Sequence, residues 1–352
     1  MAVQLDASAL MWYAPLAVLV VGVAFWALTR RPKMHIPSLK GKHVVITGGS
    51  SGIGLCIARQ CAAEGAFLTL MARTTSKLED AKSQIVSSLN VPPDSIALKS
   101  VDVSNAEAIS AAITESFAWR PIDVLICSAG ILEANFIDDA KPSKLEEIAR
   151  INILGVMFPI QAVIPLMKRR CKEHPSSIVI IGSLSSSIFL YGSNMYTPSK
   201  YALKGLAELL KFELLPFNIG VTMSCPAFTQ TPMLEEVEKE ATAFIQLGER
   251  IYLGAKRECP EQVARLTIDA FKRNVFFVST NLTGMLVRVT GRGFLPAESF
   301  STFLLELILV VPLRILTYLW LLNAKHVLLT SEVPSLKKTQ PTSSLAQKPV
   351  NS

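Results

Sequence analysis

The chain has 352 residues, of which 50% are apolar, and a formal net charge of +7. It is long enough for one large α/β domain with appended segments, and apolar enough to bury a core. The basic residues are scattered, with only short clusters such as Arg30, Arg31 and Lys33, so the charge favours a membrane surface over nucleic acid as a partner. Six cysteines without a Cys-x-x-Cys pair indicate reduced thiols in the cytosol, and four widely separated histidines indicate no metal site.

The first apolar segment runs from Ala9 to Leu28, about 20 residues without a charge, which is enough to span a bilayer as a helix. Basic residues follow it, so the positive-inside rule places the rest of the chain in the cytosol. A cleaved signal peptide is the alternative, but it requires basic residues before the run and a small-residue cleavage site after it, and the sequence has neither. We therefore expect residues 1–33 to form a membrane anchor.

A glycine-rich loop follows the first predicted strand, His43 to Thr47, and precedes a predicted helix, Leu55 to Ala63. Glycines allow the backbone to approach a pyrophosphate closely, and the N-terminus of the next helix presents free N–H groups to it. A glycine-rich loop alone is often only a tight turn, but its place between a strand and a helix indicates a dinucleotide site. The residues predicted to bind the cofactor here are Gly48, Ser50, Ser51, Gly52, Ile53 and Gly54.

Two basic residues, Arg73 and Lys77, follow the second predicted strand, Phe67 to Met71. An acidic residue at this place would bind the ribose hydroxyl of NAD, whereas basic residues suit the 2′-phosphate of NADP. The alternative is that both charges are simply solvated. The sequence favours NADPH as the cofactor.

Further predicted strands, Ile96 to Val101 and Ile122 to Cys127, alternate with helical segments. This alternation predicts an α/β fold with a doubly wound parallel sheet, whose ligand crevice lies at the carboxyl ends of the strands. Asp102 follows one strand and is expected to contact the adenine. Small residues from Ser128 to Gly130 follow the other and allow a nucleotide to approach.

A candidate catalytic set occupies the stretch from Ser183 to Lys200. Tyr196 and Lys200 are four residues apart, so on a helix they lie on one face, and a nearby ammonium lowers the pKa of a phenol. Ser183 follows an apolar run that predicts a strand, and its hydroxyl can bind the same substrate oxygen. The spacing alone is weak support, since Tyr252 and Lys256 share it. The set predicts a site that polarises a carbonyl and donates a proton.

Three further segments contribute to the predicted site. Asn152 lies in the predicted helical segment Ser143 to Met167 and is either a satisfied buried amide or part of a water relay. Thr231 follows the predicted strand Val221 to Ser224, in a loop that could cover the nicotinamide and hydrogen-bond its amide. The charged segment Glu235 to Lys256 is predicted to be helical, either as a lid over the substrate or as an ordinary solvated helix.

The C-terminal part contains an intensely apolar run, Phe303 to Leu322, interrupted by Glu306, Pro312 and Arg314. We expect residues 301–330 to be membrane-associated, as an interfacial or re-entrant segment or one half of a hairpin. A core helix is the alternative. Residues 331–352 are rich in Ser, Pro, Lys and Gln and are expected to be disordered.

The glycine loop and the serine, tyrosine and lysine described above resemble the short-chain dehydrogenase/reductase family over roughly Leu39 to Phe271. The resemblance implies a Rossmann fold over residues 34–300. It also implies that Tyr196 donates the proton and that Lys200 lowers its pKa and binds the nicotinamide ribose, so that both residues border the cofactor. Asn152 would hold a relay water.

The chain departs from the family pattern at two places. Cys127 and Ser128 stand where the family has two asparagines, and Ala227 follows Pro226 where the family has glycine. Neither change removes a reacting group.

Within the family, the segments 65–73, 196–208 and 259–264 and both apolar ends are most similar to membrane reductases of sphingoid-base synthesis. That similarity implies NADPH-dependent reduction of a long-chain keto-sphingoid base at the endoplasmic reticulum membrane, with the catalytic domain facing the cytosol. The alternatives are a membrane reductase of a steroid, a retinoid or a 3-ketoacyl thioester, and a catalytically silent nucleotide-binding scaffold. A homo-oligomer is compatible with the sequence.

Overall fold

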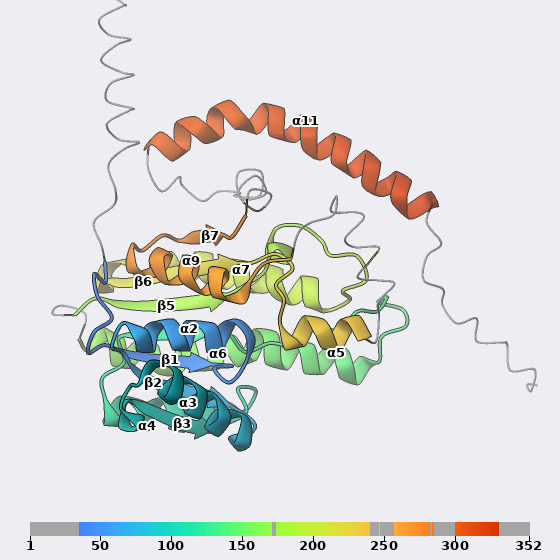
Figure 1. The fold of residues 1–352 in the computed structure, drawn as a ribbon. Helices are drawn as coiled ribbons and strands as arrows, with labels where there is room; N and C mark the ends of the chain where they lie inside the picture. The colour runs from blue at the N-terminus through green and yellow to red at the C-terminus, as the bar shows by residue number, and fades with distance from the viewer. Residues whose placement is uncertain are drawn as a thin grey trace, which may run out of the picture.

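The computed structural model describes residues 35–170, 174–239, 246, 257–281 and 284, together with the helix 300–330. Its centre is a seven-stranded sheet in the order β3-β2-β1-β4-β5-β6-β7 (Figure 1). All neighbouring strands pair in parallel, which confirms the predicted doubly wound sheet. The strands are β1 (His43–Thr47), β2 (Phe67–Ala72), β3 (Ile96–Ser100), β4 (Val124–Cys127), β5 (Ser176–Ile181), β6 (Ile219–Cys225) and β7 (Phe277–Ser279).

Helices cover both faces of the sheet. One face packs against α2 (Gly52–Ala63), α3 (Thr75–Leu89) and α9 (Pro260–Lys272). The other packs against α4 (Ala106–Trp119), α6 (Gly155–Lys168) and α7 (Tyr196–Glu213). Because both faces are covered, β1, β4, β5 and β6 are buried at every position, and consecutive apolar residues such as Val44 to Ile46 and Ile178 to Ile181 replace the alternation of a half-exposed strand.

The helical segment predicted from Ser143 to Met167 is divided into three parts. α5 (Pro142–Ala149) leads into one π-helical turn, Arg150–Leu154, and then into α6. The segment Pro142–Lys168 is apolar and long enough to cross a membrane, but its apolar side chains contribute to the core beside the sheet. It is therefore a core helix of the domain.

The helix after the glycine loop begins at Gly52, three residues before the predicted start at Leu55. Glycine has a low helix propensity, so sequence alone assigned these residues to the loop. The loop also packs very tightly. A Cβ atom on Gly48, which has a φ of +69°, would lie 2.8 Å from the backbone nitrogen of Ala129, and one on Gly54 would lie 2.3 Å from the carbonyl oxygen of Gly48. Only glycine fits at either place.

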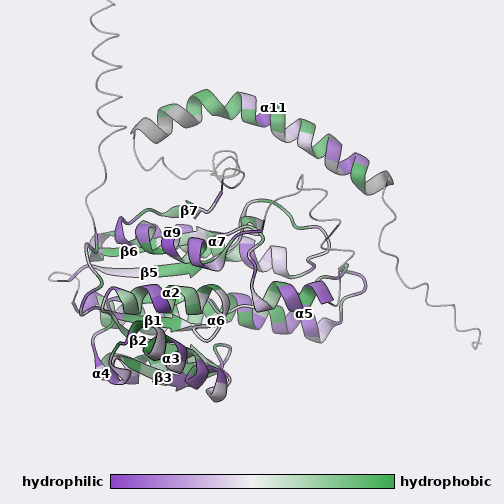
Figure 2. Cartoon of the chain, in the orientation of Figure 1, coloured by the Kyte–Doolittle hydropathy of each residue, from purple (hydrophilic) through white to green (hydrophobic). Residues whose placement is uncertain are grey.

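The C-terminal helix α11 (Phe300–Thr330) lies outside the two helix layers (Figure 1). In Figure 2 the first part of α11 is coloured mainly as hydrophobic, and hydrophilic residues appear toward its C-terminal end. Leu313 is buried, whereas Leu307, Ile308, Val311, Tyr318 and other large apolar side chains are more than half exposed. The segment Leu307–Val327 is long and apolar enough to cross a membrane. The alternative of a core helix is therefore not what residues 301–330 form.

Several expectations lie outside the described residues. These are the N-terminal anchor 1–33, the tail 331–352 and the pair Tyr252 and Lys256. Of the predicted lid, the structure describes the helical residues up to 239 and little beyond them.

We expect Gly54→Ala to lower the free energy of unfolding by about 1–3 kcal/mol, because the new methyl group overlaps the Gly48 carbonyl. Gly205→Ala is the matched control, since a Cβ atom there meets nothing within 4 Å and α7 gains helix propensity. Urea unfolding of the two purified variants measures both effects. Equal stabilities would contradict the tight packing of the loop.

Candidate active site

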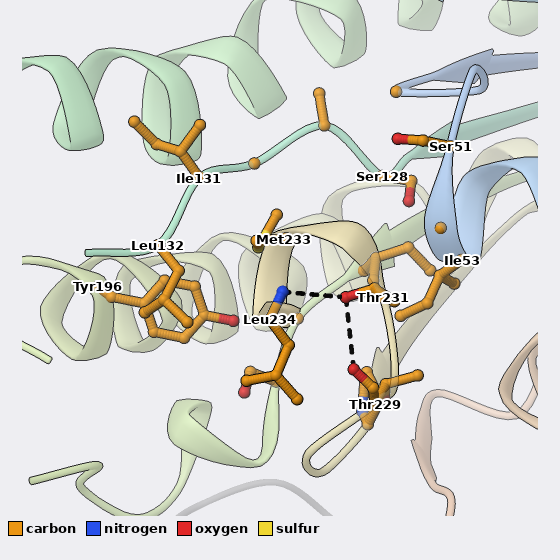
Figure 3. A pocket seen from close by; sticks show the side chains of 18 of the residues that line it. Ser51, Ile53, Ser128, Ile131, Leu132, Tyr196, Thr229, Thr231, Met233 and Leu234 are labelled. Atoms are coloured by element: carbon orange, nitrogen blue, oxygen red, sulfur yellow. Dashed lines mark hydrogen bonds between the residues drawn. The ribbon is translucent and has the colours of Figure 1, made fainter. Parts of the chain in front are cut away.

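A cavity of about 350 Å³ lies at the carboxyl ends of the strands. It includes the point between β1 and β4 where the strand order reverses, which is where doubly wound sheets bind ligands. Residues from the glycine loop, the ends of β4 and β5, the start of α7 and the segment after β6 line it (Figure 3). Of the predicted cofactor residues, all except Gly54 line this cavity.

The structure brings Ser183, Tyr196 and Lys200 together at this cavity. Ser183 lies two residues beyond β5, where its Oγ accepts a hydrogen bond from the backbone N–H of Ser185 at 3.1 Å. Tyr196 is the first residue of α7, and its hydroxyl points into the cavity (Figure 3). The Lys200 Nζ atom lies one helical turn further on, 5.4 Å from the centroid of the Tyr196 ring.

Burial controls the charge state of the tyrosine and the lysine. It raises the pKa of Tyr196, and a hydrogen bond with Ser183 lowers that pKa to a smaller extent. Burial also lowers the pKa of Lys200 to about 8, while Nζ donates to the carbonyl oxygen of Ile181 at 3.1 Å. Desolvation is the largest cause of the shift in the pKa of the phenol, and the Lys200 ammonium is not among the causes, so the expectation that the ammonium lowers this pKa stays a prediction. The phenol is held in its protonated form.

Asn152 lies in the π-helical turn and is fully buried. Its Oδ1 accepts from the N–H of Ile131 at 2.8 Å, and its Nδ2 donates to the carbonyl oxygen of Ile131 at 2.9 Å and to Ser199 Oγ at 3.1 Å. Both amide hydrogens are therefore used within the protein. Of the two predicted roles for Asn152, these bonds favour a buried amide whose hydrogen-bonding groups are satisfied within the protein. The amide connects the segment after β4 to α7, the helix that carries Tyr196.

The nucleotide end of the cavity is formed by the glycine loop and the N-terminus of α2. The N-cap residue, Ser51, makes no side-chain capping bond, and the first turn contains no acidic residue. Arg73 and Lys77 line the cavity and are exposed, and no ion pair within the described part of the chain involves either. A glycine cradle, free helix N–H groups and two cations fit the phosphates of a dinucleotide.

Asp102 and Thr231 also line the cavity, but both already have partners in the protein. Asp102 Oδ1 accepts from the N–H and the hydroxyl of Ser104, both at 2.8 Å. The Thr231 hydroxyl donates to the carbonyl oxygen of Thr229 at 3.3 Å and accepts from the N–H of Leu234 at 3.4 Å (Figure 3). Thr231 thus starts the helical residues 232–239 and places them beside Gly52, whose Cβ position would lie 3.4 Å from the threonine methyl group.

Sequence reasoning missed the apolar part of the cavity and the residues that support it. The apolar lining comes from Leu132, Ile188, Phe189, Leu190, Met233 and Leu234. Asn281, beyond β7, also lines the cavity and is bound by Glu258. No local motif identifies these residues, because they meet only through the tertiary fold.

Two kinds of comparison relate the chain to known proteins by sequence. The family model for short chain dehydrogenases matches residues 42–242. A 3-dehydrosphinganine reductase of Arabidopsis thaliana is 36% identical over 81% of this chain and 85% of its own length. A 3-ketodihydrosphingosine reductase of Mus musculus is 35% identical over 77% of this chain and 80% of its own length.

Solved structures share the fold. An actinorhodin polyketide ketoreductase with NADPH has a TM-score of 0.61 and 22% identity, covering 68% of this chain and 95% of the other. A short chain dehydrogenase/reductase from Burkholderia phymatum in complex with NAD has a TM-score of 0.64 and 23% identity, covering 72% and 94%. The family model, the parallel sheet and the tyrosine and lysine at the cavity agree, and the chain belongs to the short chain dehydrogenase family.

Proposed function

We propose that the protein is an NADPH-dependent reductase that converts 3-ketodihydrosphingosine to dihydrosphingosine in sphingolipid synthesis. The observation that carries this proposal is the group of relatives from a plant, a mammal and a fungus, Yarrowia lipolytica, that bear the name of this activity. This chain covers four fifths or more of the length of each of them. The cavity supports the same activity through its reacting groups and its apolar lining.

The reacting groups are arranged for the reduction of a carbonyl. NADPH supplies a hydride to the carbonyl carbon when it is bound. In this proposal the Ser183 hydroxyl donates a hydrogen bond to the carbonyl oxygen, and the protonated Tyr196 phenol gives that oxygen its proton. With a pKa of about 8, Lys200 carries its charge at neutral pH and stabilises negative charge that develops beside it.

The substrate end of the cavity suits a long alkyl chain. The apolar side chains that line the cavity include Phe189, Leu190, Met233 and Leu234. Each buried methylene of the substrate contributes about 0.8 kcal/mol to binding. The Phe189 ring also contacts Trp320 of α11, with ring centroids 5.8 Å apart. The apolar lining therefore reaches α11, whose apolar side chains are largely exposed.

We propose that α11 lies at the membrane surface beside this end of the cavity, so that the lipid substrate reaches the site from the bilayer. The large exposed apolar surface of α11 supports this placement. The basic residues after the N-terminal apolar run support a cytosolic catalytic domain on the endoplasmic reticulum. Free thiols at all five described cysteines are consistent with that compartment.

Tyr196→Phe is expected to lower turnover of 3-ketodihydrosphingosine by about 100-fold or more, because the ring remains while the proton donor is lost. NADPH binding, measured by fluorescence, is expected to remain nearly unchanged. Tyr201→Phe on the same helix is the control, since Tyr201 is exposed and does not line the cavity. Equal loss of binding and turnover would contradict the role of the phenol.

The same assay tests the substrate. The unsubstituted protein is expected to oxidise NADPH faster with 3-ketodihydrosphingosine than with a steroid ketone, retinal or a 3-ketoacyl thioester. A preference for one of these three would assign another membrane reductase activity, and inactivity with every ketone would favour a nucleotide-binding scaffold.

Arg73→Asp is expected to weaken NADPH binding by roughly 10- to 100-fold, since it replaces a charge-assisted hydrogen bond to the 2′-phosphate with repulsion. NADH binding should change little. Arg59→Asp is the control, because Arg59 is exposed on α2 away from the cavity. The dissociation constants of NADPH and NADH, measured for each variant, give the preference for NADPH. If Arg73→Asp leaves the ratio of the two constants unchanged, Arg73 does not bind the 2′-phosphate.

A photo-crosslinking amino acid in place of Leu319 is expected to form adducts with phospholipid when the full chain is reconstituted in vesicles. Leu209 on α7 is the matched control, since both leucines are 54% exposed. Mass spectrometry of the adducts distinguishes the two positions. Equal lipid adducts at both, or none at Leu319, would argue against a membrane position for α11.

A further inference from the structure

The carboxylate of Glu258 connects three segments that are distant in sequence. It lies just before α9 and accepts hydrogen bonds from the backbone N–H of Ala227 at 3.2 Å, from the hydroxyl of Thr280 and from Asn281 Nδ2 at 2.8 Å. Its donors therefore come from the segment after β6 and from the end of β7. An ionised carboxylate can accept all three bonds, because its two oxygens offer about four lone-pair sites.

These donors belong to the wall of the cavity. Ala227 and Asn281 line it, and the segment Pro226–Thr231 forms its side beside Gly52. The carbonyl oxygen of Pro226 accepts from the N–H of Leu184 at 2.8 Å, immediately after Ser183. A hydrogen-bonded path thus connects Glu258 to the serine end of the reacting set.

The backbone of Glu258 holds the same segment independently of its side chain. Its N–H donates to the carbonyl oxygen of Phe228 at 2.7 Å, and its carbonyl oxygen accepts from the N–H of Gln230 at 3.0 Å. A substitution at position 258 therefore leaves the segment attached. It removes only the bonds that fix Ala227 and Asn281 to a common point.

We propose that Glu258 is a positioning residue for catalysis. Its carboxylate holds the Pro226–Thr231 segment and Asn281 against the cavity, and so sets the alignment of the reacting carbonyl with Ser183, Tyr196 and the hydride donor. This inference rests on the proposed reductase function. It predicts a larger effect on turnover than on cofactor affinity, because Arg73 and Lys77 lie outside the Pro226–Thr231 segment that Glu258 holds.

Glu258→Gln keeps the shape of the side chain but leaves one acceptor oxygen for three donors. We expect kcat to fall roughly 10-fold or more, from the loss of bonds to a charged acceptor, while the dissociation constant for NADPH changes less than about threefold. Hydrogen–deuterium exchange of the peptide 226–231 should accelerate. Glu64→Gln is the control, since Glu64 pairs with Lys272 at 2.8 Å and does not line the cavity.

Thr280→Val is a second variant, chosen because Thr280 donates to Glu258 but does not line the cavity. Thr280→Val should also lower kcat and accelerate exchange of the peptide 226–231. Both changes should be smaller than those in Glu258→Gln. Unchanged kcat in both variants, or a parallel loss of NADPH affinity, would overturn the proposal.

All rates are measured with 3-ketodihydrosphingosine and with a short 3-keto ester. If the unsubstituted protein reduces only the ester, the proposed substrate is wrong, and Glu258 is still judged on the ester. If it reduces neither, the reductase function fails, and unchanged exchange of peptide 226–231 in Glu258→Gln would separately refute the positioning role.

Discussion

The hydrogen bond from the Lys200 ammonium to the carbonyl oxygen of Ile181 joins the start of α7 to the end of β5. The two ends of this bond carry the reacting groups, since Ser183 lies two residues after the strand and Tyr196 one turn before the lysine. The bond is buried, so it is stronger than it would be in water, and the ammonium would be costly to bury without it. The alignment of phenol and serine hydroxyl therefore depends on this connection between helix and sheet.

Around that connection, the cavity is lined by segments that are distant from one another in the sequence. The glycine loop and Arg73 line the same cavity as the apolar side chains of Phe189, Met233 and Leu234. Phe189 also contacts Trp320, and this contact connects the cavity lining to α11.

Much of the fold and part of the site could be predicted from short stretches of sequence. The strand His43–Thr47 was predicted with its observed bounds, and the place of Ser183 beyond a strand was predicted from the apolar run before it. The helix start at Gly52 and the π-helical turn around Asn152 could not be predicted, since glycine and a lone asparagine have low local preference for these states.

The sequence by itself determined the order of strands and helices, the phosphate-binding loop and the pairing of Tyr196 with Lys200, because turn chemistry and helical spacing act over a few residues. Only the tertiary structure decided the surroundings of the Tyr196 phenol, the bonding of Asn152 and the contacts of Glu258. The partners of Glu258 are 22 to 31 residues away along the chain. Desolvation and hydrogen-bond satisfaction depend on which distant segments the folded chain brings together. A pattern over a few residues of sequence does not predict such contacts.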